Sequence, residues 1–146
     1  MFKNILLGTD GSAASEHAAK LAVDLARVHG ATLTALFVVD PYPYLGIGET
    51  NPLGFQAYMS AAQQHAAQAH TKVSALCTAR EPHVRLEVRL VEDVTAAHGI
   101  VQTAESEKAD LVVVGSHGRT GVARMVLGSV ASKVVTQSPV PVLVAR

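Results

Sequence analysis

A glycine-rich segment in the last third of the chain has the residue types and the spacing of an anion site. Two residues separate Gly115 from Gly118, and nine separate Gly118 from the pair Gly128-Ser129. Glycine lets the backbone approach a ligand closely, and a helix that starts at Gly128-Ser129 would offer free N–H groups to a phosphate. Arg119 could add a charge-assisted hydrogen bond to the same phosphate. The segment therefore predicts phosphate binding.

A second candidate loop, Thr9-Asp10-Gly11-Ser12, follows the first apolar run of the chain. Ser12 can cap the helix that follows. Asp10 could have only the structural role of placing a negative charge near the N-terminus of that helix, where the helix dipole is stabilised. Ser129 could be only a helix cap as well, and Gly115 taken alone would be an ordinary glycine between a strand and a loop. The spacing of the whole glycine string favours ligand binding over these purely structural roles.

Two other phosphate motifs are excluded, and the histidines do not favour a catalytic role. The chain has no Gly-x-x-x-x-Gly-Lys-Ser/Thr sequence, and Gly46-x-Gly48 lacks the third glycine and the helix of a dinucleotide fingerprint. His117 could titrate near neutral pH, but the sequence shows no orienting partner for a general base. The remaining histidines lack zinc-like spacing. We expect neither a catalytic residue nor a metal site built from protein side chains.

The elements around these loops alternate between strand and helix. Apolar runs predict strands at 2–8, 32–39, 84–91, 111–114 and 140–144. Helical periodicity and capping residues predict helices at 13–29, 55–79, 95–108 and 129–137, with a long loop over 40–54. This order is typical of a doubly wound α/β fold, in which helices cover both faces of a mainly parallel, five-stranded sheet. We expect one domain over residues 1–146.

The position of the ligand follows from this fold class. The charged residues that alternate with apolar ones over 84–91 indicate an edge strand, whereas the continuous apolar run 111–114 indicates a central one. In open α/β sheets, ligands bind beyond the carboxyl ends of the strands, where the strand order reverses. The loops after the first and fourth strands, which carry Asp10 and Gly115, are therefore the candidate site.

Composition narrows the possible partners. The chain has 146 residues, 12 Lys plus Arg, 12 Asp plus Glu and a pI of about 7.1. This balance predicts no binding to nucleic acid or to an anionic membrane, and no segment approaches the roughly 20 apolar residues of a membrane-spanning helix. The single cysteine, Cys77, fits a reducing compartment. We expect a soluble, cytoplasmic protein.

Several motifs of the chain resemble those of the universal stress protein family. They are Ile5-Leu6-Leu7-Gly8-Thr9-Asp10-Gly11-Ser12, Ala109-Asp110-Leu111, Gly-Ser-His-Gly-Arg at 115–119 with Leu127-Gly128-Ser129-Val130, and Pro139-Val140-Pro141-Val142-Leu143-Val144. The resemblance covers the whole chain and implies the sheet order 3-2-1-4-5, with strand 84–91 at an edge. Some family members bind ATP, and those keep the glycine pattern, whereas others lack both. This chain has the pattern, so the resemblance implies that it belongs to the ATP-binding branch.

Carried over position by position, the resemblance implies that Asp10 and Val38 hold the adenosine end of ATP. The other residues that it implies for the nucleotide site are Thr9, Gly115, Gly118, Arg119, Gly128, Ser129 and Val130. Mg²⁺ or Mn²⁺ could accompany the nucleotide. The chain departs from the family pattern after the third strand, where Glu92 stands in place of a common glycine.

The glycine string and the family resemblance together imply a nucleotide-dependent regulatory module of the stress response. Such a module would exchange one regulatory protein partner for another when its ATP state changes. A slow ATPase or nucleotidyl transferase, and a nucleotide-free dimeric scaffold with purely structural glycines, are the alternatives. The uncharged run 140–144 predicts an apolar sheet edge that pairs with its own copy across a two-fold axis. The resemblance implies the same homodimer, with Val140, Val142 and Val144 at or beside the interface.

Overall fold

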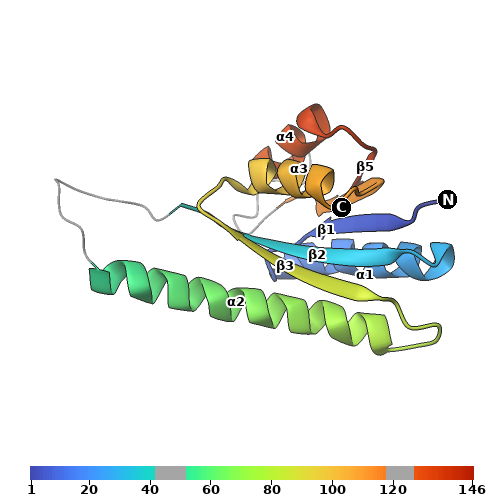
Figure 1. The fold of residues 1–146 in the computed structure, drawn as a ribbon, viewed down its shortest axis with the longest axis horizontal. Coiled ribbons are helices and arrows are strands. Elements are labelled where there is room, and N and C mark those ends of the chain that lie inside the picture. Colours follow the sequence, from blue (N-terminus) through green and yellow to red (C-terminus); the bar gives the residue numbers. More distant parts are fainter. Residues whose placement is uncertain (42–51, 118–126) are drawn as a thin grey trace.

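The computed structural model describes residues 1–41, 52–117 and 127–146. Strands and helices alternate along these ranges, which confirms the predicted order of elements (Figure 1). They are β1 (Asn4–Gly8), α1 (Ala13–His29), β2 (Thr32–Val39), α2 (Pro52–Thr78), β3 (Leu86–Glu92), α3 (Ala96–Ser106), β4 (Leu111–Gly115), α4 (Ser129–Gln137) and β5 (Val142–Ala145).

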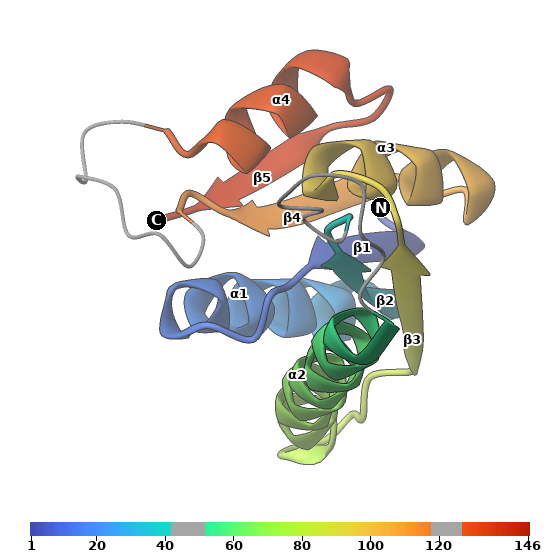
Figure 2. The same cartoon turned by 90° about the vertical axis from the view of Figure 1, so that its left-hand side faces the viewer.

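The strands form a parallel sheet in the order β3-β2-β1-β4-β5, which confirms the predicted fold class and the edge position of β3. At the centre of the sheet, Leu7 of β1 pairs with Ala35 of β2 on one side and with Val113 of β4 on the other. Helices α1 and α2 cover one face of the sheet, and α3 and α4 cover the other (Figure 2).

The two central strands are buried on both faces. Ile5, Leu6 and Leu7 of β1 and Val112 and Val113 of β4 are 0% exposed. Side chains alternate between the faces of a strand, so Ile5 and Leu7 pack with α1, whereas Leu6 packs with α3 and α4. Continuous burial of this kind is the reason that central parallel strands read as uninterrupted apolar runs.

The boundaries of both edge strands differ from those predicted. β3 covers Leu86–Glu92 rather than 84–91, and β5 begins at Val142 rather than at residue 140. Proline has no N–H to donate to a neighbouring strand. This explains why β5 begins only after Pro139 and Pro141. The carbonyl of Pro141 nevertheless accepts a hydrogen bond from the N–H of Val112 of β4 at 3.0 Å.

Helix α2 extends past the carboxyl ends of the strands (Figure 1). It begins at Pro52, inside the segment predicted to be a loop, and proline is well tolerated in the first turn of a helix. Arg27 of α1 holds the C-terminal end of α2 in place. The guanidinium donates to the carbonyls of Leu76 and Pro82 at 3.0 Å and to the carboxylate of Asp24 at 3.1 Å.

His70 of α2 has a buried ring nitrogen. Its Nε2 atom has no hydrogen-bond partner within the described part of the chain. Burial lowers the pKa of His70, and the backbone of Ala35 and Arg89 opposes this effect only in part. The folded chain therefore favours the neutral imidazole, whereas the unfolded chain takes up a proton at a pKa of about 6.5.

We expect the contribution of His70 to the free energy of unfolding to be fully present above about pH 6.5 and to be lost as the pH drops below that value. His70→Gln, which does not titrate, should make the fall of the free energy of unfolding with pH shallower. Urea unfolding at about pH 7.5 and about pH 5.5 measures the difference. His65→Gln changes an exposed histidine of the same helix and should keep the pH dependence of the unmodified chain. Identical pH dependence in both variants would contradict this role of His70.

Candidate nucleotide site

The carboxyl ends of β1 and β4 meet where the strand order of the sheet reverses. β1 leads through α1 to β2 on one side, and β4 leads through α4 to β5 on the other. The parallel pairing of Leu7 with Val113 brings the two predicted loops, which follow Gly8 and Gly115, to the same sheet edge. Ligands of open α/β sheets bind at this kind of switch point.

The β1–α1 loop is held by a backbone hydrogen bond to β2 and by its own side chains. Thr9 N–H donates to the carbonyl of Leu36 at 3.0 Å, and Gly11 N–H donates to Thr9 Oγ1 at 3.2 Å. Asp10 Oδ1 accepts from Ser12 N–H at 2.9 Å and from the Ser12 hydroxyl. Gly11 has a φ of +74°, a left-handed conformation that glycine adopts without strain. Asp10 thus supports the start of α1, which was the structural role considered for it.

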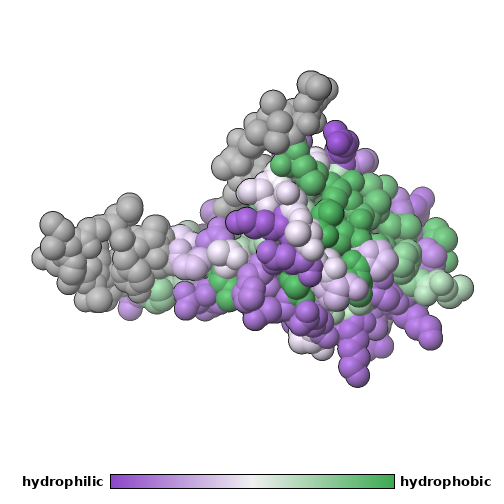
Figure 3. Space-filling view, turned by 90° about the horizontal axis from the view of Figure 1, so that it is seen from above, coloured by the Kyte–Doolittle hydropathy of each residue, from purple (hydrophilic) through white to green (hydrophobic). Residues whose placement is uncertain are grey.

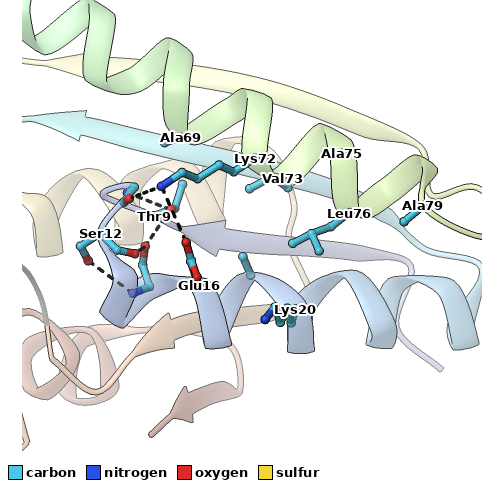
Figure 4. A pocket seen from close by; sticks show the side chains of 13 residues that line it. Thr9, Ser12, Glu16, Lys20, Ala69, Lys72, Val73, Ala75, Leu76 and Ala79 are labelled. Carbon is cyan, nitrogen blue, oxygen red and sulfur yellow. Dashed lines mark hydrogen bonds and ion pairs between the residues drawn. The ribbon is translucent and has the colours of Figure 1, made fainter.

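Lys72 of α2 contacts this loop, and sequence reasoning missed it. Its Nζ donates to the carbonyl of Gly11 at 3.2 Å and lies 3.7 Å from Glu16 Oε1 of α1 (Figure 4). The ammonium group therefore links α2 to the loop that carries Asp10. No motif connects Lys72 with a glycine 61 residues earlier, so the sequence offered no signal for this contact.

Close approach of the backbone explains Gly128 but not Gly115. Gly128 N–H donates to the carbonyl of Ser116 at 2.7 Å, and a Cβ at Gly128 would lie 2.7 Å from that same oxygen. A Cβ at Gly115 would lie 3.4 Å from the carbonyl oxygen of Ala14 in the first turn of α1, which is an ordinary van der Waals distance. Only Gly128 therefore needs the absence of a side chain. The contact of these glycines with phosphate stays a prediction.

The first turn of α4 lies at the same sheet edge (Figure 2). Gly128 is its N-cap, so Ser129 is the first helical residue and not the cap that the sequence suggested. The first N–H groups of a helix have no intrahelical carbonyl partner, and those of Ser129 and Val130 belong to this set. Ser129 is exposed, and Val130 is 38% exposed. Two other predicted site residues, Gly118 and Arg119, lie outside the described residues.

Val38 and the end of β3 complete the described part of this edge. Val38 is half-buried near the end of β2, where a Cβ at Gly99 of α3 would approach its Cγ2 to 3.0 Å. Glu92, the departure from the family pattern, is exposed as the last residue of β3. Asp93 follows with a φ of +61°. Aspartate tolerates this left-handed conformation better than most residues, so the turn needs no glycine here.

His117 has a partner that the sequence did not reveal. Its Nδ1 lies 3.0 Å from the hydroxyl oxygen of Ser116, which is only 6% exposed. The described ranges contain no group of three His, Cys, Asp or Glu residues that could hold a metal ion. None of the helices in these ranges is long and apolar enough to cross a membrane.

Comparisons with known proteins agree with this architecture. The sequence model of the universal stress protein family matches residues 1–146. A universal stress protein of Methanocaldococcus jannaschii is 36% identical over 146 residues, which are 100% of this chain and 83% of the relative.

Solved structures give the same result. Universal stress protein UspA from Lactobacillus plantarum has a TM-score of 0.80 at 29% identity, with 99% of this chain and 97% of that chain covered. A universal stress protein solved in complex with cAMP has a TM-score of 0.70 at 26% identity, with the same coverage of 99% and 97%. The chain belongs to the universal stress protein family.

Proposed function

We propose that this chain binds ATP at the carboxyl ends of β1 and β4 and serves as a nucleotide-dependent regulatory module of the stress response. The observation that carries the proposal is the position of the Asp10 loop and the first turn of α4 at one switch point. The relative solved with cAMP, an adenine nucleotide, supports the ligand class.

The proposed orientation of the nucleotide follows from the charges at this edge. The phosphates would lie against the first turn of α4, because the N–H groups of Ser129 and Val130 and the helix dipole attract anions. The adenosine would lie toward Asp10 and Val38, where a carboxylate can accept a hydrogen bond from a ribose hydroxyl. Mg²⁺ in nucleotide sites is usually coordinated by phosphate oxygens. The phosphates of ATP would coordinate Mg²⁺ or Mn²⁺ in the same way here.

We propose binding rather than catalysis, with a regulatory protein as the partner that responds to the nucleotide. Robust hydrolysis needs a positioned general base, and the ring of His117 faces the shielded hydroxyl of Ser116. The proposed location is the cytoplasm, where the thiol of Cys77 would stay reduced. Burial raises the pKa of this thiol and so lowers its reactivity, although Arg27 acts in the opposite direction.

Ser129→Asp should weaken ATP binding at least about tenfold, because like charges at an interface cost several kcal/mol, and should leave adenosine binding unchanged. The new carboxylate repels the phosphates but favours the start of α4, since negative charge at a helix N-terminus is stabilising. The free energy of unfolding should therefore stay equal or rise. Isothermal titration with ATP and with adenosine, together with urea unfolding, measures both effects.

Gln137→Glu is the matched control, because it adds the same charge at the exposed, opposite end of α4. Its ATP affinity should stay within about twofold of the unmodified value, since surface charges are screened over about 10 Å. An unchanged ATP affinity in Ser129→Asp, or an equal loss for ATP and adenosine, would overturn the phosphate assignment.

His117→Ala separates the binding module from the ATPase alternative. Any ATP turnover should fall by less than about tenfold, below the roughly 10²–10⁴ that a positioned acid–base group contributes. Steady-state release of phosphate measures this, with His98→Ala, at an exposed position of α3, as the control. A collapse of turnover confined to His117→Ala would establish an ATPase instead.

We also propose that the chain forms a homodimer through β5. The carbonyl of Pro141 accepts a hydrogen bond from Val112 of β4, and that of Ala145 accepts one from Ser116, the residue after β4. Because backbone polar groups alternate between the two sides of a strand, those of Val142 and Val144 point toward the free edge of the sheet. An unpaired apolar edge favours association with a second copy across a two-fold axis.

The surface beside this edge is also apolar. Figure 3 shows hydrophobic side chains gathered on the side of the molecule that carries α4 and β5. Val130 and Val135 of α4 are 38% and 48% exposed, respectively. The side chains of Val142 and Val144 are half-buried against the α3–α4 face, so lysine substitutions there would disturb the fold together with any interface. The dimer therefore has to be tested through the backbone.

Val144→Pro removes the N–H that points away from β4, and proline is accepted on edge strands. We expect the dimer dissociation constant to rise at least about tenfold, since several cross-edge hydrogen bonds depend on this register. Val144→Ala loses similar packing but keeps the N–H and should remain dimeric. Sedimentation at micromolar concentration distinguishes the variants. A monomeric unmodified chain, or an unaffected dimer in Val144→Pro, would contradict the assignment.

A further inference from the structure

A groove of about 460 Å³ lies between α1 and α2, beside the β1–α1 loop (Figure 4). Its floor is formed by Ala19, Ala69 and Val73, which are at most 5% exposed, and its accessible apolar part by Ala75 and Leu76 of α2 and by Ala79 just after it. The polar lining residues are Thr9, Ser12, Ser15, Glu16, Lys20 and Lys72, so the groove borders the β1–α1 loop. The short alanine side chains leave a gap between the two helices that larger residues would fill. The volume falls in the range of small-molecule sites, which are mostly apolar with a few polar groups that fix orientation.

The charges around the groove favour an anion. A second cavity of about 290 Å³ shares Lys20, Leu76 and Ala79 with the first and continues it toward Arg80. The charged residues that line the two cavities are Glu16, Lys20, Asp24, Arg27, Lys72 and Arg80. The cations therefore outnumber the anions by four to two.

Lys20 is the available cation of this set. Lys72 pairs with Glu16 at 3.7 Å, and both Arg27 and Arg80 contact Asp24. Within the described ranges, the ammonium group of Lys20 forms neither a hydrogen bond nor an ion pair. It lies on α1, at the point where the two cavities join.

We propose that the α1–α2 groove binds a medium-chain carboxylate, with its alkyl chain along Ala75, Leu76 and Ala79 and its carboxylate at Lys20. Methyl and methylene walls suit an alkyl chain, since burial of apolar surface drives such binding. None of the residues lining the groove is aromatic, so a nucleobase would find no stacking partner there. The inference goes beyond the proposed nucleotide function and does not depend on it.

Decanoate is the probe, titrated below its micelle concentration into protein carrying ¹³C-labelled methyl groups. We expect saturable shifts of the methyl signals of Ala75, Leu76 and Ala79. Ala75→Phe places a large side chain into the groove from an exposed position of α2 and should weaken binding at least about tenfold, because the alkyl chain loses its space. Ala67→Phe, at an exposed position of α2 outside the lining, should bind as the unmodified chain does.

Lys20→Met tests the anionic part of the proposal, because it removes the charge and keeps the apolar stem. Decanoate affinity should fall about threefold, which is the size of an exposed ion pair, while the affinity for decanol stays unchanged. Lys133→Met, an exposed cation of α4 on the opposite face of the sheet, should have no effect. Absence of saturable shifts, unchanged binding in Ala75→Phe, or equal responses of decanoate and decanol to Lys20→Met would each overturn the proposal.

Discussion

The parallel pairing of β1 with β4 under complete burial is the constraint on which the rest of the structure depends. Both strands are apolar on both faces, so each face needs a helical layer over it. The layers are connected by crossovers that leave the pair in opposite directions, through α1 on one side and α4 on the other. The reversal creates the switch point, and with it the place where the Asp10 loop and the first turn of α4 meet.

Much of this arrangement could be predicted because it depends on patterns within short segments. The uninterrupted apolar run of β4 indicated a central strand, and the cap residues Ser12 and Gly30 marked the ends of α1 where the structure has them. The ends of β5 were less predictable. Pro139 and Pro141 signalled an edge, but a single sequence does not show which residues of the run pair with β4.

The candidate site was predictable only at the level of its two loops. The strand order that brings Asp10 and Gly115 to one edge came from the family resemblance and not from hydrophobic patterns. Contacts between distant segments, such as Lys72 with Gly11, leave no local trace in the sequence. One glycine of the string also has a purely structural reason, because Gly128 is needed for close backbone approach whether or not a phosphate lies beside it.

The hydrogen bond from Gly128 N–H to the carbonyl of Ser116 has a consequence for how this scaffold can diverge. It joins the chain just after β4 to the chain just before α4, so the intervening segment is closed at its base by groups that belong to the fold. Lengthening a closed loop costs only about 0.6 kcal/mol for each doubling of its length. A change in the length of the chain between these two hydrogen-bonded residues should therefore cost little folding free energy, because the bond holds the end of β4 beside the start of α4 whatever that length is.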